Sequence, residues 1–189
     1  MANPKALVKA ILPREVPGMQ LLKVETETLK DQLVPPYAGA EVEAAGNRIV
    51  RAGWLASGHT YSRPDGHKVV VVVDVNLFRT TSDAKRLFAM EQALRPPAPN
   101  KLVTENVPTG AAPESAYTCA SKPGYSGCTL VWRQGAVIAY VQLLGKGPSA
   151  LNPGVAEGLV PLLLPVQLQV AKSISGQCVM SDGTLKQAA

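Results

Sequence analysis

The chain has 189 residues, of which 46% are hydrophobic, and its formal net charge is +5 at pH 7. This apolar content excludes wholesale disorder, one domain is expected at this length, and no apolar run approaches the ~18 residues that span a bilayer. Basic residues are scattered and aromatic residues make up only 5%, which argues against a nucleic-acid partner.

The first predicted element is a short helix near the N-terminus. Asn3 suits its N-cap and Pro4 its first helical position, and apolar residues then recur at helical spacing. Residues 19–33 are ambiguous between a strand and a polar segment. Residues 37–47 indicate another short helix.

The clearest strands come next. Residues 48–61 are predicted as a strand with an irregularity at Gly53 or Gly58, followed by a turn at 63–66. Residues 69–75, VVVVVDV, are typical of a central strand buried on both faces. A buried carboxylate needs a partner, so we expect Asp74 near the exposed end of this strand.

A helix follows, with Thr81 or Ser82 as its cap and apolar residues at spacings of three and four until Pro96. Lys85 falls outside that apolar stripe and is expected to face solvent. Residues 95–114 form a Pro-rich connector.

The second half contains predicted strands at 116–120, 129–133 and 136–144, then a helical segment at 152–173. Pro161 and Pro165 are expected to kink or split that segment. Residues 48–94 and 116–173 therefore have the same order of elements, which indicates a ββα pseudo-repeat. We predict a single α+β domain of two ββα-like halves, forming an antiparallel sheet with its helices on one face.

Cys119 and Cys128 flank the turn-rich segment SKPGYSG, which can return the chain on itself. A structural disulfide is favoured, and it implies an oxidising compartment. Two reduced core cysteines are the alternative. A metal pair is disfavoured because zinc sites need four ligands and the two histidines are not suitably spaced. Cys178 is left over, either free or pairing in place of one of the others.

Catalytic motifs are weak. Ser82 and Lys85 match the S-x-x-K spacing of a serine hydrolase, but a helix start explains them better. His59, Asp65 and His67 are interpreted as exposed hairpin residues. We predict no catalytic residue, no cofactor and no metal site.

Charge is sparse in the second half. Residues 129–171 contain only Arg133, Lys146 and Glu157 as charged residues, and they include the run LVPLLLPV. Such a segment is core, an oligomer interface or the wall of an apolar pocket. We therefore expect this half to contact an apolar small molecule or a second copy of the chain. The side chains best suited to line a pocket are aromatic: Trp54, Tyr61, Trp132 and Tyr140.

Three loose motifs can be assembled along the chain. The first is ILPxxVPG at residues 11–18, and the second is an apolar strand ending in Phe78, then Thr80 to Ala84. The third comprises Tyr117, Cys119, Gly127, Cys128, Val131, Gly135, Ala139, Tyr140 and Val141. Together they resemble secreted proteins and lipoproteins of actinobacteria and the extracytoplasmic sensor-like domains related to them.

The resemblance implies an exported α+β domain of a group often of unknown function. We therefore expect an extracytoplasmic, non-enzymatic ligand-binding or sensor-like domain, secreted or membrane-anchored. A homodimeric interaction module is the alternative, and a hydrolase using Ser82 and Lys85 is a weaker one. No leader or lipidation cysteine is visible at the start, so we expect the leader to have been removed, with a lipid anchor conceivable on the native precursor.

Overall fold

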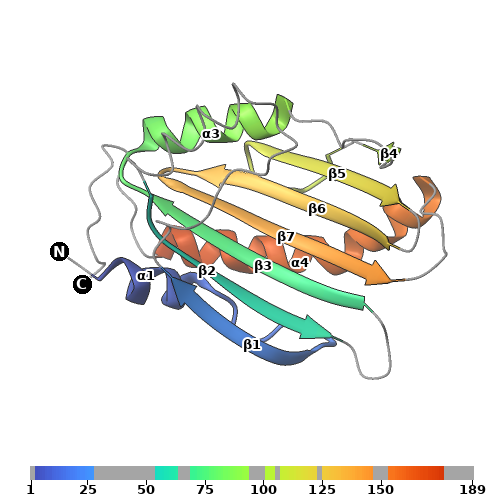
Figure 1. The fold of residues 1–189 in the computed structure, drawn as a ribbon, viewed down its shortest axis with the longest axis horizontal. Coiled ribbons are helices and arrows are strands. Elements are labelled where there is room, and N and C mark those ends of the chain that lie inside the picture. The colour runs from blue at the N-terminus through green and yellow to red at the C-terminus, as the bar shows by residue number, and fades with distance from the viewer. Residues whose placement is uncertain are drawn as a thin grey trace.

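Three helices and seven strands occur within the residues that the computed structural model describes, which are 3–27, 54–63, 69–93, 101–104, 107–122, 125–146 and 153–176 (Figure 1). In chain order they are α1 (Pro4–Ile11), β1 (Gln20–Glu27), β2 (Trp54–Arg63), β3 (Val69–Phe78), α3 (Thr81–Ala93), β4 (Lys101–Thr104), β5 (Ser115–Lys122), β6 (Tyr125–Gln134), β7 (Val137–Lys146) and α4 (Pro153–Gly176). The helix predicted at 37–47 lies outside the described residues.

The strands form one seven-stranded antiparallel sheet in the order β1-β2-β3-β7-β6-β5-β4. β3 and β7 pair at its centre in an unbroken register, from Val69 opposite Gly145 to Leu77 opposite Val137. This long-range pairing joins the two halves of the chain. The predicted α+β class with an antiparallel sheet is confirmed.

The two faces of the sheet are covered by different helices. The α4 face packs on α1 and α4, and its central strands contribute Val71, Val73, Val75 and Leu77 from β3 and Val137, Ala139, Val141 and Leu143 from β7. The α3 face packs on α3 through a smaller cluster of Phe78, Ala84, Leu87, Phe88 and Ile138. Side chains alternate between the faces along each strand, so adjacent residues serve different clusters.

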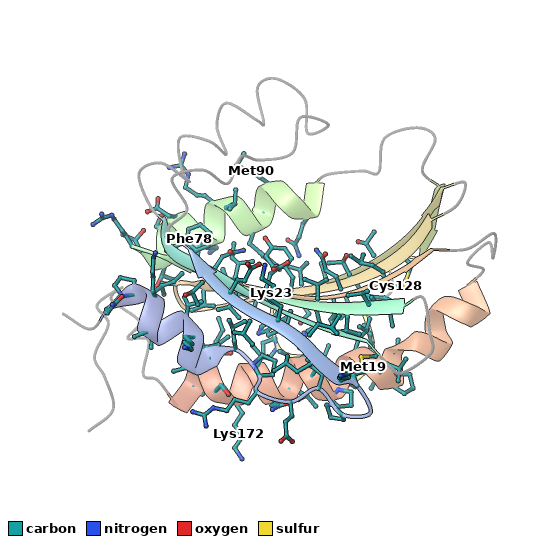
Figure 2. The ribbon with its side chains drawn as sticks, turned by 60° about the horizontal axis from the view of Figure 1, so that its bottom comes forward. Met19, Lys23, Phe78, Met90, Cys128 and Lys172 are labelled. Atoms are coloured by element: carbon teal, nitrogen blue, oxygen red, sulfur yellow. A yellow bond between two sulfur atoms is a disulfide. The ribbon has the colours of Figure 1, made fainter. Side chains whose placement is uncertain are left out.

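The expectation that all helices lie on one face is therefore wrong. Figure 2 shows α3, with Met90, on one side of the sheet and α1 and α4 on the other. The physical reason is that β3 and β7 are apolar on both faces near the Phe78 end. Phe78 and Ile138 point away from the main core and would be exposed unless a second helix covered them.

The internal repeat remains a prediction. The strand order β2-β3-β7-β6 is the order that two ββα units would adopt around a two-fold axis normal to the sheet. Such an axis would keep both helices on one face, whereas α3 and α4 lie on opposite faces.

Helix α1 begins as predicted, with the Asn3 side chain accepting a hydrogen bond from the Lys5 backbone N–H at 3.0 Å and Pro4 in the first turn. It lies on β2 where that strand has no side chain. A Cβ added at Gly58 would lie 2.8 Å from Val8 Cγ1, 2.9 Å from Leu12 Cδ1 and 2.8 Å from the Glu25 carbonyl oxygen. The register of β2 is irregular between Trp54 and Ala56 and not at Gly58, which is instead a site of close helix–strand approach.

Gly58→Ala should destabilise the protein by about 1–3 kcal/mol, because the added methyl overpacks a site bounded partly by backbone. Urea unfolding followed by circular dichroism measures this. Gly176→Ala is the matched control, since nothing lies within 4 Å of that position. Equal stability of the two variants would contradict the close packing of α1 on β2.

Helix α4 is continuous over 24 residues, so the two prolines do not split it. Pro161 and Pro165 are four residues apart and both are exposed, whereas Leu163, Val166 and Val170 are buried against the sheet. The prolines therefore lie on the solvent side, where the carbonyls that lose a helical donor can reach water.

The predicted connector contains more structure than its prolines indicated. β4 pairs with β5 at the sheet edge, and the following segment is tied to α4 by the fully buried Gln167. Its Oε1 accepts from the Ala112 N–H at 3.1 Å, and its Nε2 donates to Ser115 Oγ at 3.0 Å. Glu114, at φ 53°, forms a two-pronged ion pair with Arg133 that holds this left-handed residue in place.

Candidate functional site

The α3 face carries a group of polar side chains that α3 does not bury. We define the polar patch as Asp74 of β3, Tyr140 and Gln142 of β7, and Thr129 of β6, all of them half-buried. α3 packs on the same three strands, but its buried contacts gather around Phe78 and Ile138. The patch therefore continues the α3 face from the helix toward solvent.

Strand register places Asp74 and Tyr140 of the patch in one row across the sheet, and Gln142 and Thr129 in a neighbouring row. Glu25 on β1 is opposite position 59 on β2, which is opposite Asp74, which is opposite Tyr140. Directly opposed residues in an antiparallel sheet have Cβ atoms about 4.5–5.5 Å apart. The backbone thus brings two carboxylate positions, a histidine position and a phenol position together on four neighbouring strands.

Two expectations are corrected here. Asp74 lies in the middle of β3 rather than at an exposed strand end, and it is half-buried because helix cover is incomplete on its face. His59 lies within β2, opposite Asp74, and not at a turn. Asp65 and His67 lie outside the described residues, so their expected place in an exposed hairpin stays a prediction.

Tyr140 marks the boundary between the patch and the α3 cluster. It packs partly against that cluster together with Met90 and Val131. On the other side it adjoins Gln142 and Thr129, which are directly paired residues of β7 and β6. The patch therefore contains one carboxylate, one amide, one hydroxyl and one phenol, all of them groups that form hydrogen bonds.

Sequence reasoning missed Thr129 and Gln142. Both are polar residues that lie between buried neighbours in their strands, as with Val141 and Leu143 around Gln142. An alternation of apolar and polar residues along a strand indicates that one face of the sheet is not fully covered.

The four aromatic residues proposed to line a pocket do not form one group. Trp132 is fully buried in the core of the α4 face, whereas Tyr140 lies half-buried on the α3 face. A single pocket cannot be lined by both. Positions 54 and 61 fall on β2, but the side chains of Trp54 and Tyr61 are outside what the structure describes.

Trp132 and Tyr117 are both buried on the α4 face. The Trp132 Nε1–H has no hydrogen-bond partner among the described residues. Burial also raises the pKa of the Tyr117 phenol, since desolvation disfavours the phenolate. We assign this face to the core rather than to a site.

Cys119 and Cys128 are joined by a disulfide. They are directly opposed on β5 and β6, with Cα atoms 4.1 Å apart, and both are fully buried on the α4 face. Figure 2 shows the sulfur–sulfur bond between the sheet and α4. The bond therefore locks the register of two strands next to the main core. Cys178 lies outside the described residues.

Thiol counting under denaturing, non-reducing conditions should find one reactive thiol, from Cys178. Replacing both Cys119 and Cys128 by Ser should lower stability by about 2–3 kcal/mol according to the loop-entropy model, because the closed loop is short. Three reactive thiols in the unaltered protein would contradict the bond.

The S-x-x-K pair lies on the first turns of α3, and Ser82 and Lys85 are both exposed. The helix cap is Thr80, one residue earlier than expected. Its Oγ1 accepts from the Asp83 N–H at 3.0 Å and donates to Asp83 Oδ2 at 2.8 Å. Thr80 is thus the N-cap of α3, and the local sequence is explained by helix initiation.

The outer side of α4 carries exposed apolar residues. Leu162 and Leu168 are 46% and 47% exposed, and Pro161 and Pro165 lie between and beside them. Leu163 faces the core, and Lys172 points outward further along the helix (Figure 2). On α4, the contact surface expected for the second half is therefore limited to these exposed leucines and prolines.

Leu163→Glu should prevent folding, because an unpaired carboxylate would replace a fully buried side chain. Leu162→Glu on the exposed side should fold with stability changed by less than about 0.5 kcal/mol. Thermal unfolding of the two variants compares them directly. A folded Leu163→Glu protein would contradict the assigned orientation of α4.

The chain matches no protein-family model and no curated protein. Among solved structures, it is similar to the extracellular domain of PknH from Mycobacterium tuberculosis, with a TM-score of 0.55 and 13% identity over 89% of this chain and 96% of that chain. It also matches an uncharacterized protein, an Rv0999 ortholog, from Mycobacterium smegmatis, with a TM-score of 0.38 and 10% identity over 87% and 95% of the two chains. The first likeness shows a shared fold.

Within the described ranges, none of the helices has both the length and the hydropathy needed to cross a membrane.

Proposed function

We propose that this protein is an extracytoplasmic, sensor-like domain that binds a polar ligand on the polar patch. The observation that carries the proposal is the half-buried group of Asp74, Tyr140 and Gln142 on two central strands whose other side chains are mostly apolar. Polar residues at such positions weaken a sheet core, so their presence favours a binding role.

Two further observations support an extracytoplasmic location. The buried disulfide is typical of proteins that fold in an oxidising compartment. The fold is also that of an extracellular domain, the one from PknH. The motif resemblance to exported actinobacterial proteins points in the same direction.

The ligand chemistry follows from the patch. Its groups are hydrogen-bond donors and acceptors beside one aromatic ring, a combination that fits a hydroxyl-rich molecule better than the apolar molecule expected from the sequence. The apolar residues of the second half are instead largely used in the core of the α4 face.

Hexoses at millimolar concentration, titrated into the isotope-labelled protein, should shift the backbone amide signals of residues 72–76 and 140–142. Gln142→Met keeps the volume and removes the amide, so hexose binding should weaken about fivefold, as expected for one neutral hydrogen bond of about 1 kcal/mol. Lys172→Ala, on the outside of α4, is the control and should bind as the unaltered protein does.

An apolar dye provides the opposing measurement. Shifts that appear only with the dye, and that map to α4, would contradict the polar-patch site. Unchanged hexose binding by Gln142→Met would exclude this residue from the site.

A further inference from the structure

Strand β1 is an edge of the sheet with the character of an interface. No strand lies beyond it among the described residues, so its outer N–H and C=O groups face away from β2. Three of its exposed side chains are apolar, with Leu21, Leu22 and Val24 at 39%, 46% and 38% exposure, and its register with β2 is irregular only between Leu21 and Lys23. The backbone groups of a long edge strand are a template for pairing with another strand.

The opposite edge differs. β4 has four residues, whereas β1 has eight. A short edge strand is one of the ways in which proteins prevent edge-to-edge pairing. The two ends of the sheet are therefore not equivalent, and β1 is the one built long enough to accept a strand.

The charges on β1 are self-complementary. Lys23 and Glu25 lie on either side of Val24 and form an ion pair with each other within the strand. If a second β1 pairs antiparallel with the first and Val24 faces its own copy, each Lys23 is directly opposite the other Glu25. Registers centred on Lys23 or on Glu25 place like charges opposite each other instead, which is unfavourable.

We propose that two copies of this chain associate through β1, paired antiparallel and centred on Val24. The partner is thus a second copy, joined by backbone hydrogen bonds and two intermolecular Lys23–Glu25 pairs. The contact is isologous, so it closes at a dimer. A peptide from another protein would match β1 equally well only if it carried the same Lys-apolar-Glu pattern.

Two antiparallel strands in one sheet are related by a two-fold axis normal to the sheet. This axis leaves corresponding side chains of the two strands on the same side of the sheet. The α3 faces of both copies therefore lie on the same side of one continuous sheet. Glu25, which ends the row containing Asp74 and Tyr140, lies at the junction.

Sedimentation equilibrium of the full chain from micromolar to millimolar concentration tests the proposal. The unaltered protein should show a monomer–dimer equilibrium. Lys23→Glu and Glu25→Lys should each weaken self-association at least tenfold, because each creates two like-charge contacts. The double variant carrying both changes should dimerise like the unaltered protein, since the charges are exchanged but still complementary.

Mixing the two single variants gives a second readout. Equimolar Lys23→Glu and Glu25→Lys should form a heterodimer, since each strand then supplies the charge that the other lacks. Lys172→Glu, an exposed lysine on α4, is the control for a general effect of net charge. Circular dichroism verifies that every variant is folded, as expected for surface positions.

Three results would overturn the proposal. The first is a monomer at millimolar concentration, and the second is a dimer that the single variants do not weaken. The third is failure of the mixed variants to associate. Amide hydrogen exchange locates the contact independently, because residues 20–27 should exchange more slowly as protein concentration rises, and unchanged exchange there would also exclude β1.

Discussion

The pairing of β3 with β7 is the constraint on which the rest of the structure depends. It joins strands that are about 70 residues apart in the sequence and are apolar on both faces near Phe78 and Ile138. A strand pair of this kind cannot leave either face in water, so helices are needed on both sides. α1 and α4 cover one face and α3 the other, and β1, β2, β5 and β6 extend the sheet outward from this centre.

Helix cover differs between the two faces of the sheet. The central strands have ten residues and extend about 33 Å, and the 24 residues of α4 extend about 36 Å. The 13 residues of α3 extend only about 20 Å. α3 therefore covers less of its face than α1 and α4 together cover of theirs. Asp74, Gln142 and Thr129 lie on the α3 face outside the α3 cluster, where they alternate with the apolar Val72.

The sequence was sufficient for what depends on local patterns. The cap of α1 at Asn3, the buried strand after residue 69 and the solvent position of Lys85 follow from spacing and capping rules. The disulfide followed from the turn between Cys119 and Cys128. These features involve residues close together in the chain, where periodicity and turn chemistry carry the information.

Features that depend on distant partners were not predictable in the same way. The location of α3 depends on which side Phe78 and Ile138 face, and the environment of Asp74 depends on where α3 ends. Trp132 and Tyr140 have similar surroundings in the sequence, yet Trp132 is fully buried and Tyr140 only half-buried, because they lie on opposite faces of the sheet. The residues of β4 were predicted to belong to the Pro-rich connector. They form a strand because they pair with β5, and that pairing is not visible in the local sequence.

Glu25 of the β1 edge lies in the same row of the sheet as Asp74 of the polar patch, with one strand between them. This residue ends the row that contains Asp74, and in the proposed dimer it also faces Lys23 of the second copy. A ligand that draws the Glu25 carboxylate toward the patch weakens the intermolecular pair, whereas one that leaves it in place does not. Because binding free energies are reciprocal, any effect of the ligand on self-association must equal the effect of self-association on ligand affinity. If both proposals hold, a sheet whose row of polar residues ends at its pairing edge can thus couple the two events without any change in fold.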